Sequence, residues 1–178
     1  MGNSFFAYLQ QLELLAFFSG YPLIYLIAVS FAGNRQEKNN FKSRLILLLP
    51  FTYALMGTLF LGYQLKKLYP YYSLENIQET FQHPYLVAWA LLSLLFWIPF
   101  IAQKKVLSLF HSLVFFFILV KDFFLQLSAS DAENDILRND MKIYTLSLLL
   151  NLGAFALIIL LSFLITFHRK RRGSSPVR

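Results

Sequence analysis

Five side chains that could bind a ligand or carry a proton lie within otherwise apolar stretches of the sequence. They are Glu13, Asp122, Gln126, Asn151 and His111. Ionisable and amide side chains are costly in hydrocarbon, so in a membrane protein they usually face other helices or water. Carboxylate and amide oxygens suit a cation, a proton or a polar headgroup, and an imidazole suits proton transfer. These residues are therefore the first candidates for function.

The four carboxylate and amide candidates are predicted to lie in the outer half of a membrane. Glu13 begins one apolar segment, Asp122 and Gln126 end another, and Asn151 lies ~12 Å into a third. They form either a small polar pocket that opens outward, or separate hydrogen bonds between helices worth ~1 kcal/mol each. The second interpretation is favoured because neither carboxylate is near the bilayer centre. Lys121 either extends to the headgroups or pairs with Glu13 at matching depth.

His111 is about six residues from the cytoplasmic end of its segment. Haem ligation by two histidines would need a second His at equal depth, but His83 is in a loop and His168 is near the membrane boundary. We therefore interpret His111 as a neutral ring that hydrogen-bonds to a neighbouring helix, with a proton relay as the alternative.

Enzyme activity has no positive support in the sequence. There is no Ser–His–Asp arrangement, no phosphate-binding glycine loop, no HExxH pair and no paired acidic metal motif within a segment. The absence of cysteine excludes disulfides, Cys-based metal sites and thiol nucleophiles. We predict no enzyme activity, no cofactor and no metal site, and the identity of any small-molecule ligand stays open.

The elements that must position the candidates follow from composition. Of 178 residues, 57% are hydrophobic and 14% charged, and the mean hydropathy is +0.55, whereas soluble domains are about one quarter charged. A helix needs ~20 mostly apolar residues to cross a bilayer. We predict an all-α, polytopic membrane bundle forming a single transmembrane domain over residues 1–178. Its five spans are 12–33, 45–65, 85–102, 106–127 and 143–167, and residues 168–178 form a basic tail.

Two of these spans have a polar face. Ser108, His111, Ser112, Asp122 and Gln126 fall on one side of the fourth span, and Tyr144, Ser147, Asn151, Ser162 and Thr166 on one side of the fifth. Both faces are predicted to contact protein. The prolines at 22, 50 and 99 each remove a backbone hydrogen bond, and Gly20-Tyr21-Pro22 is the expected hinge.

The connections are short. Residues 103–105 predict a tight antiparallel hairpin. Residues 73–82 predict a short helix lying flat on the membrane. Gly57 and Gly62 are five apart, so they do not match the GxxxG spacing of close helix contacts.

Charge predicts the orientation. Eleven of the 16 Lys and Arg fall in the connection 34–44, the link 103–105 and the tail. Basic loops are retained in the cytoplasm, so the amino terminus is predicted outside and the tail inside. The net charge of +7 then reflects topology and does not indicate nucleic-acid binding.

The sequence favours a non-enzymatic accessory or scaffolding subunit of a membrane assembly, since the loops are short and five spans rarely enclose a transport route. The expected partners are the lipid bilayer and other membrane subunits or further copies of the chain. A small oligomeric transporter, channel or sensor that uses the outer polar residues is the alternative. The absence of glycosylation sequons and the short loops fit a bacterial inner membrane.

Overall fold

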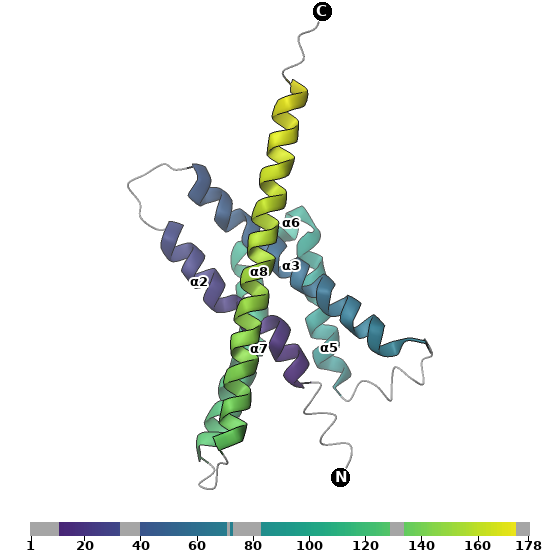
Figure 1. Cartoon of the computed structure of the whole chain (residues 1–178), viewed down its shortest axis with the longest axis vertical. Helices are drawn as coiled ribbons and strands as arrows, with labels where there is room; N and C mark the ends of the chain where they lie inside the picture. Colours follow the sequence, from purple (N-terminus) through teal and green to yellow (C-terminus); the bar gives the residue numbers. More distant parts are fainter. Residues whose placement is uncertain (1–10, 33–39, 71, 73–82, 129–133, 174–178) are drawn as a thin grey trace, which may run out of the picture.

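The computed structural model describes residues 11–32, 40–70, 72, 83–128 and 134–173, and every regular element in these ranges is helical (Figure 1). A helical segment over residues 11–18 precedes α2. The further elements are α2 (Tyr21–Ala32), α3 (Asn40–Leu68), α5 (Pro84–Leu91), the 3₁₀ helix η1 (Leu92–Trp97), α6 (Pro99–Ala102), α7 (Lys105–Ser128) and α8 (Asn134–Gly173). The predicted surface helix 73–82 lies outside the described residues.

Four helical segments are long and apolar enough to cross a membrane. They are Gln11–Phe31, Arg44–Leu68, Lys105–Leu125 and Met141–His168. Each coincides with a predicted span to within a few residues, so the all-helical class and these four segments are confirmed.

The predicted span 85–102 is not one of the four, because it is divided. An α-helix over Pro84–Leu91 continues as 3₁₀ helix to Trp97, and Ile98 then has an extended backbone before α6. Pro99 accounts for this break, since a proline disfavours the helical conformation of the residue before it. Only two residues separate Ala102 from the start of α7, so the connection is as short as the predicted hairpin requires.

The first membrane segment is also interrupted, at Ser19 and Gly20. Pro22 has no N–H to offer the carbonyl of Phe18, and its ring crowds that carbonyl, so the helix cannot run on unchanged. The interruption lies where Gly20-Tyr21-Pro22 predicts a hinge. It leaves backbone groups without helical partners about 14 Å into a segment that is long enough to cross a bilayer.

Helix α3 is the centre of the bundle and contacts α2, α5, η1, α6, α7 and α8. A Cβ atom on Gly57 would lie 2.1 Å from Oγ of Ser93, so this glycine allows η1 to approach α3 closely. Gly62 has nothing within 4 Å of such a Cβ atom. Gly57 therefore serves close packing although the two glycines do not form a GxxxG pair.

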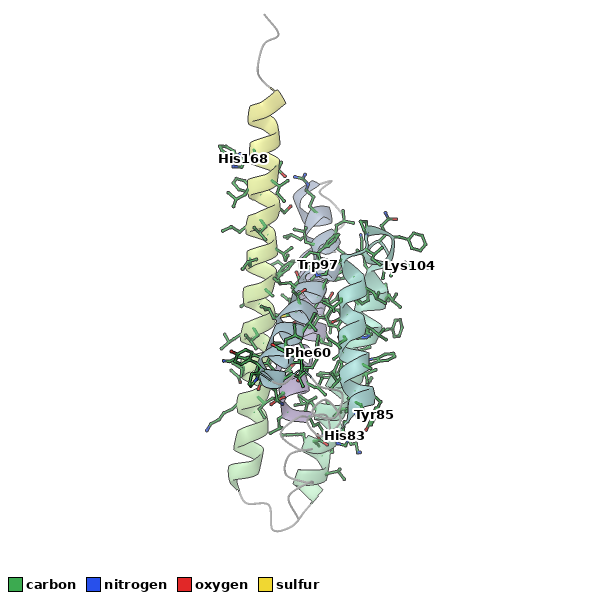
Figure 2. All side chains as sticks on the ribbon, turned by 90° about the vertical axis from the view of Figure 1, so that its right-hand side faces the viewer. Phe60, His83, Tyr85, Trp97, Lys104 and His168 are labelled. Carbon is green, nitrogen blue, oxygen red and sulfur yellow. The ribbon has the colours of Figure 1, made fainter. Side chains whose placement is uncertain are left out.

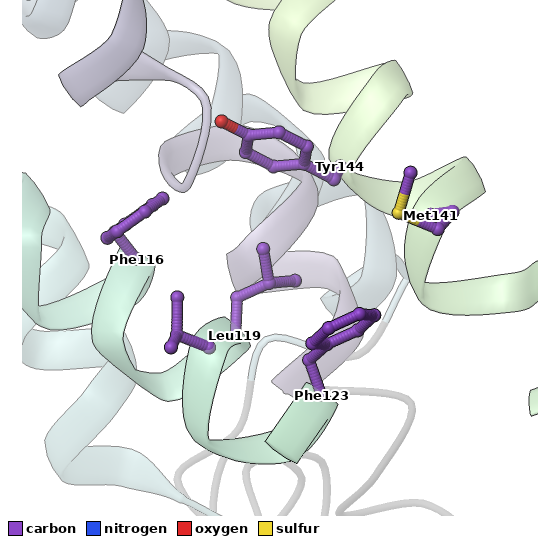
Figure 3. A pocket seen from close by; sticks show the side chains of 6 residues that line it. Phe116, Leu119, Phe123, Met141 and Tyr144 are labelled. Atoms are coloured by element: carbon purple, nitrogen blue, oxygen red, sulfur yellow. The ribbon is translucent and has the colours of Figure 1, made fainter. Parts of the chain in front are cut away.

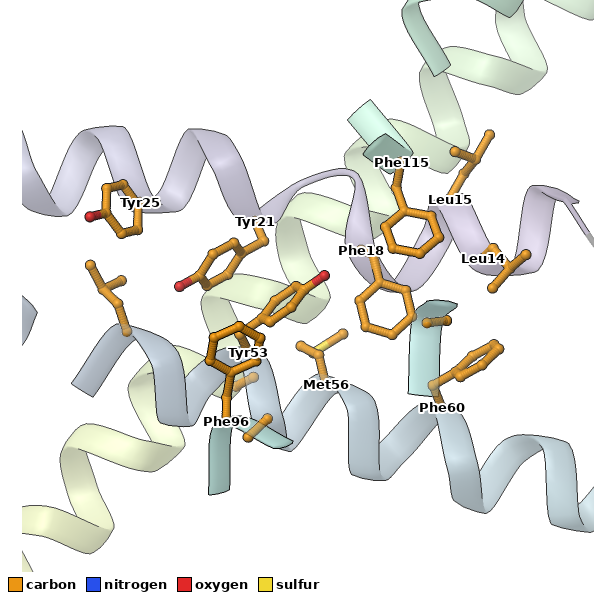
Figure 4. Packing of buried hydrophobic residues seen from close by; sticks show 14 of the residues in the cluster. Leu14, Leu15, Phe18, Tyr21, Tyr25, Tyr53, Met56, Phe60, Phe96 and Phe115 are labelled. Atoms are coloured by element: carbon orange, nitrogen blue, oxygen red, sulfur yellow. The ribbon is translucent and has the colours of Figure 1, made fainter. Parts of the chain in front are cut away.

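Aromatic rings fill the space between the first segment, α3 and α7 (Figure 4). Phe18 is fully buried and stacks on Phe115 with ring centroids 4.9 Å apart. It also meets Phe60 and Tyr53 edge to face at 5.4 and 5.6 Å, a geometry that adds to the energy of burial. Seven aromatic residues thus belong to the buried core cluster.

Helix α8 is the most exposed long helix. Its 40 residues span about 60 Å, twice the thickness of a bilayer core, and its C-terminal end extends beyond the other helices (Figures 1 and 2). Only 17% of its most apolar window is buried, against 56% in the first segment. The buried residues form one narrow line along the helix: Ser147, Asn151, Ala154 and Ile158.

Candidate functional site

The most polar buried contact joins α8 to the interruption in the first segment. Asn151 Nδ2 donates to the carbonyl of Phe17 at 2.9 Å and to the carbonyl of Ser147 at 2.8 Å. The amide of Gly20 donates to Oγ of Ser147 at 2.8 Å. Side chains of α8 therefore replace hydrogen bonds that the first segment loses at its break. The predicted polar face of this span is confirmed at Ser147 and Asn151, both fully buried.

The backbones approach very closely at this point. A Cβ atom on Gly20 would lie 2.7 Å from the backbone nitrogen of Leu148 and from the carbonyl carbon of Ser147. No side chain fits there without moving α8. Gly153, on the exposed side of α8, would have nothing within 4 Å of an added Cβ atom. Close packing thus requires a glycine at position 20, and the interrupted part of the first segment packs directly against the backbone of α8.

His111 lies in a second buried cluster. Its Nδ1 atom shares a 2.6 Å hydrogen bond with the hydroxyl of Tyr53 on α3. The ring stacks on Trp89, with centroids 4.7 Å apart and planes at 4°, and the Trp89 indole donates to the His111 carbonyl at 3.4 Å. This is the contact to neighbouring helices that the sequence predicts.

Tyr21 extends this cluster along α7. Its hydroxyl lies 2.8 Å from Oγ of Ser108, and Ser108 itself donates to the carbonyl of Lys105 at 2.8 Å. Because serine has one hydroxyl proton, Tyr21 is the donor of the first bond. The rings of Tyr21 and Tyr53 are 4.5 Å apart and lie side by side in Figure 4. The cluster therefore ties three membrane segments together.

The two carboxylates bind different partners. Glu13 accepts hydrogen bonds from Lys67 at 2.9 and 3.1 Å and from the hydroxyl of Tyr63 at 3.0 Å. Asp122 accepts a hydrogen bond from Nε2 of Gln11. Glu13 therefore faces α3, whereas Asp122 joins α7 to the first segment. The predicted alternative of a Lys121–Glu13 pair is wrong, because Lys67 occupies that place and Lys121 is exposed.

Three of the predicted outer polar residues, Glu13, Asp122 and Asn151, thus lie on or contact the first segment. No hydrogen bond joins any of these three described residues to another. Glu13 bonds to Tyr63 and Lys67, and Asp122 bonds to Gln11. Asn151 bonds to the carbonyls of Phe17 and Ser147. The side chain of Gln126 lies outside the described residues, although its backbone belongs to α7. Whether these residues bind a ligand stays a prediction.

Sequence reasoning missed two buried tyrosines and one glutamine. Tyr21 and Tyr53 are fully buried, and their hydroxyls explain why Ser108 and His111 have partners. Gln64 is 3% exposed, and its amide has no partner among the residues that the structure describes. The sequence signal that could have identified them is the presence of hydroxyl and amide side chains within apolar helices, at spacings that place them on one side of the helix.

An apolar pocket separates α7 from α8 beside these contacts (Figure 3). It has a volume of about 230 Å³. Phe116, Leu119, Val120, Phe123, Met141 and Tyr144 line it. The lining offers no charged group, and its only polar side-chain group is the Tyr144 hydroxyl, so the pocket has little means of selecting a ligand.

Two buried atoms in the clusters have no hydrogen-bond partner among the described residues. They are the ring nitrogen Nε2 of His111 and the amide oxygen Oδ1 of Asn151. Within those same ranges no group of three His, Asp or Glu side chains is arranged to hold a metal ion. The hydrogen bonds of the two clusters, around Asn151 and around His111, fix the positions of neighbouring helices relative to one another. Family models, curated proteins and solved structures give no match to this chain.

Proposed function

We propose that the protein works by association, as a non-enzymatic accessory or scaffolding subunit of a membrane assembly. The observation that carries the proposal is the narrow buried line on α8. Only Ser147, Asn151, Ala154 and Ile158 of its membrane segment are buried against the bundle. The remaining surface is available to another membrane protein, and Gly153 gives it a point where a partner backbone can approach closely.

The polar contacts support the same function. Glu13, Asp122 and Asn151 are each bound to a different neighbour within the chain. A carrier or channel needs polar groups that converge on one cavity or path, whereas these three side chains, in the described part of the chain, bind separate neighbours. Non-enzymatic association requires only a stable bundle with an open helix face.

The proposal includes five crossings, with the amino terminus outside and the tail in the cytoplasm of a bacterial inner membrane. The 3₁₀ helix supports a crossing by the divided segment, because a rise of ~2.0 Å per residue lets α5 and η1 span ~24 Å before α6. The first segment begins and α8 ends at opposite ends of the bundle (Figure 1). The chain has no cysteine, so a single cysteine at position 36 tests the orientation. Labelling from outside the cell would contradict it.

The test of association is recovery of partners after extraction in mild detergent, followed by native mass spectrometry. We expect at least one other membrane protein at fixed stoichiometry. Gly153→Ile should reduce its recovery at least fivefold without affecting the chain's own stability, since the site is open. Gly62→Ile is the matched control, because Gly62 is equally open but lies on α3.

Two results would count against association. The first is a parent protein that purifies alone as a stable monomer or homo-oligomer. The second is equal partner recovery from the Gly153→Ile and Gly62→Ile variants, which would show that this face of α8 binds only lipid.

A further inference from the structure

We propose that the groove between the start of α3 and the C-terminal half of α8 binds one anionic phospholipid. The groove has a volume of about 740 Å³, within the range of small-molecule sites. The cytoplasmic side of the groove rests on the orientation in the proposed function, whereas lipid binding does not require the scaffolding role, so the two proposals can fail separately.

The lining is polar at one end and apolar along the rest. Arg44 begins its membrane segment, and Ser162 and Thr166 lie near the end of theirs. Leu48, one turn inside Arg44, and Ile159, one turn inside Ser162, belong to the apolar part. A groove with a charged mouth at the membrane boundary and a hydrocarbon interior matches the two parts of a phospholipid.

The length of the groove fits one leaflet. On α8 the lining extends from Ala156 to Thr166, which is about 15 Å at the helical rise of 1.5 Å per residue. The hydrocarbon core of a bilayer is about 30 Å thick. An acyl chain that enters beside Arg44 therefore has apolar lining down to about the midplane.

The charge at the mouth selects an anion. Arg44 is exposed and forms no ion pair with any residue that the structure describes. A guanidinium binds phosphate oxygens through two parallel hydrogen bonds. In the sequence, further basic residues precede Arg44 in the connection 34–44 and follow Thr166 at positions 169–172. Basic groups between helices at the cytoplasmic boundary are typical of anionic headgroup sites.

The hydroxyls at the mouth have different roles. Thr166 donates to the carbonyl of Ser162 at 2.8 Å, so its proton is already used within α8. The Ser162 hydroxyl has no hydrogen-bond partner among the described residues. Ser162 is therefore the second donor available to a phosphate, beside Arg44.

The test is native mass spectrometry of the full chain in detergent, titrated with phosphatidylglycerol or with phosphatidylcholine of the same acyl chains. We expect one phosphatidylglycerol to bind several-fold tighter than phosphatidylcholine. Arg44→Gln should weaken phosphatidylglycerol binding about fivefold, the usual effect of one basic residue near an anionic lipid. Lys104→Gln removes the same charge from an exposed site outside the groove and should leave binding unchanged.

A second variant tests the apolar part without changing charge. Ile159→Trp fills the groove and should weaken both lipids, whereas soluble glycerol phosphate should compete with neither. Equal affinity for the two lipids, equal loss in the Arg44→Gln and Lys104→Gln variants, or unaltered binding by Ile159→Trp would overturn the proposal.

Discussion

Replacing Gly20 by alanine should destabilise the bundle more than any comparable glycine change. The new Cβ atom would lie 2.7 Å from backbone atoms of Ser147 and Leu148. Backbone atoms cannot rotate away as the tip of a side chain can, so α8 must shift as a whole. Overpacking of this kind costs about 1–3 kcal/mol.

The shift also weakens a hydrogen bond. The 2.8 Å contact from the Gly20 amide to Oγ of Ser147 is one of the bonds that satisfy the broken segment, and such bonds in membranes contribute about 1 kcal/mol. The expected loss is therefore about 2–4 kcal/mol, which corresponds to roughly a 30- to 700-fold change in the unfolding equilibrium.

The measurement is reversible unfolding in mixed micelles with increasing sodium dodecyl sulfate, followed by the fluorescence of the two tryptophans. Gly62→Ala and Gly153→Ala are matched controls, because a Cβ atom at either position meets nothing within 4 Å. Alanine is the better helix former, so both controls should unfold at the same detergent fraction as the parent or slightly higher. If Gly20→Ala unfolds together with these controls, the close approach of the first segment to α8 is refuted.

Four further substitutions, in three experiments, test the polar contacts by the same unfolding assay. Asn151→Leu should cost about 1–2 kcal/mol, because it leaves the Phe17 carbonyl at the break without its side-chain donor; stability equal to the parent would contradict that role. Tyr53→Phe should cost about 1 kcal/mol and shift the ¹⁵N signals of His111, whose Nδ1 loses its partner; unchanged signals would count against the contact. Glu13→Gln and Lys67→Gln, alone and combined, should show a coupling of about 0.5–1 kcal/mol that falls with added salt; a coupling of zero would show that the ion pair does not stabilise the bundle.

Much of the fold was predictable because local signals determine it. Long apolar stretches define four of the segments, and the spacing of Ser108, His111 and Ser112 identifies the buried side of α7, where all three are buried. Helical periodicity likewise separates a buried side of α8, which carries Asn151, from an exposed side, which carries Gly153. These features depend on one helix at a time.

The partners of the polar residues were not predictable, because they depend on how helices cross. Glu13 and Lys67 are 54 positions apart, and nothing in either segment specifies that they meet. Depth alone made Lys121 an equally reasonable partner for Glu13. The similar depth of the polar residues in the membrane allowed them to share one pocket. The rotation of each helix about its own axis instead directs their side chains to separate neighbours.

The same distinction between local and tertiary causes separates the breaks at Pro22 and Pro99. At Pro99 the repair is local: the carbonyl of Leu95, which loses its helical partner, accepts the amide of Ile98 at 3.0 Å. A tightened turn of this kind can be anticipated from sequence. At Pro22 the repair is tertiary, since Asn151 and Ser147 of α8 supply it from 127 or more positions away. A buried amide in an apolar helix therefore need not indicate a ligand, because a broken helix elsewhere in the bundle can account for it.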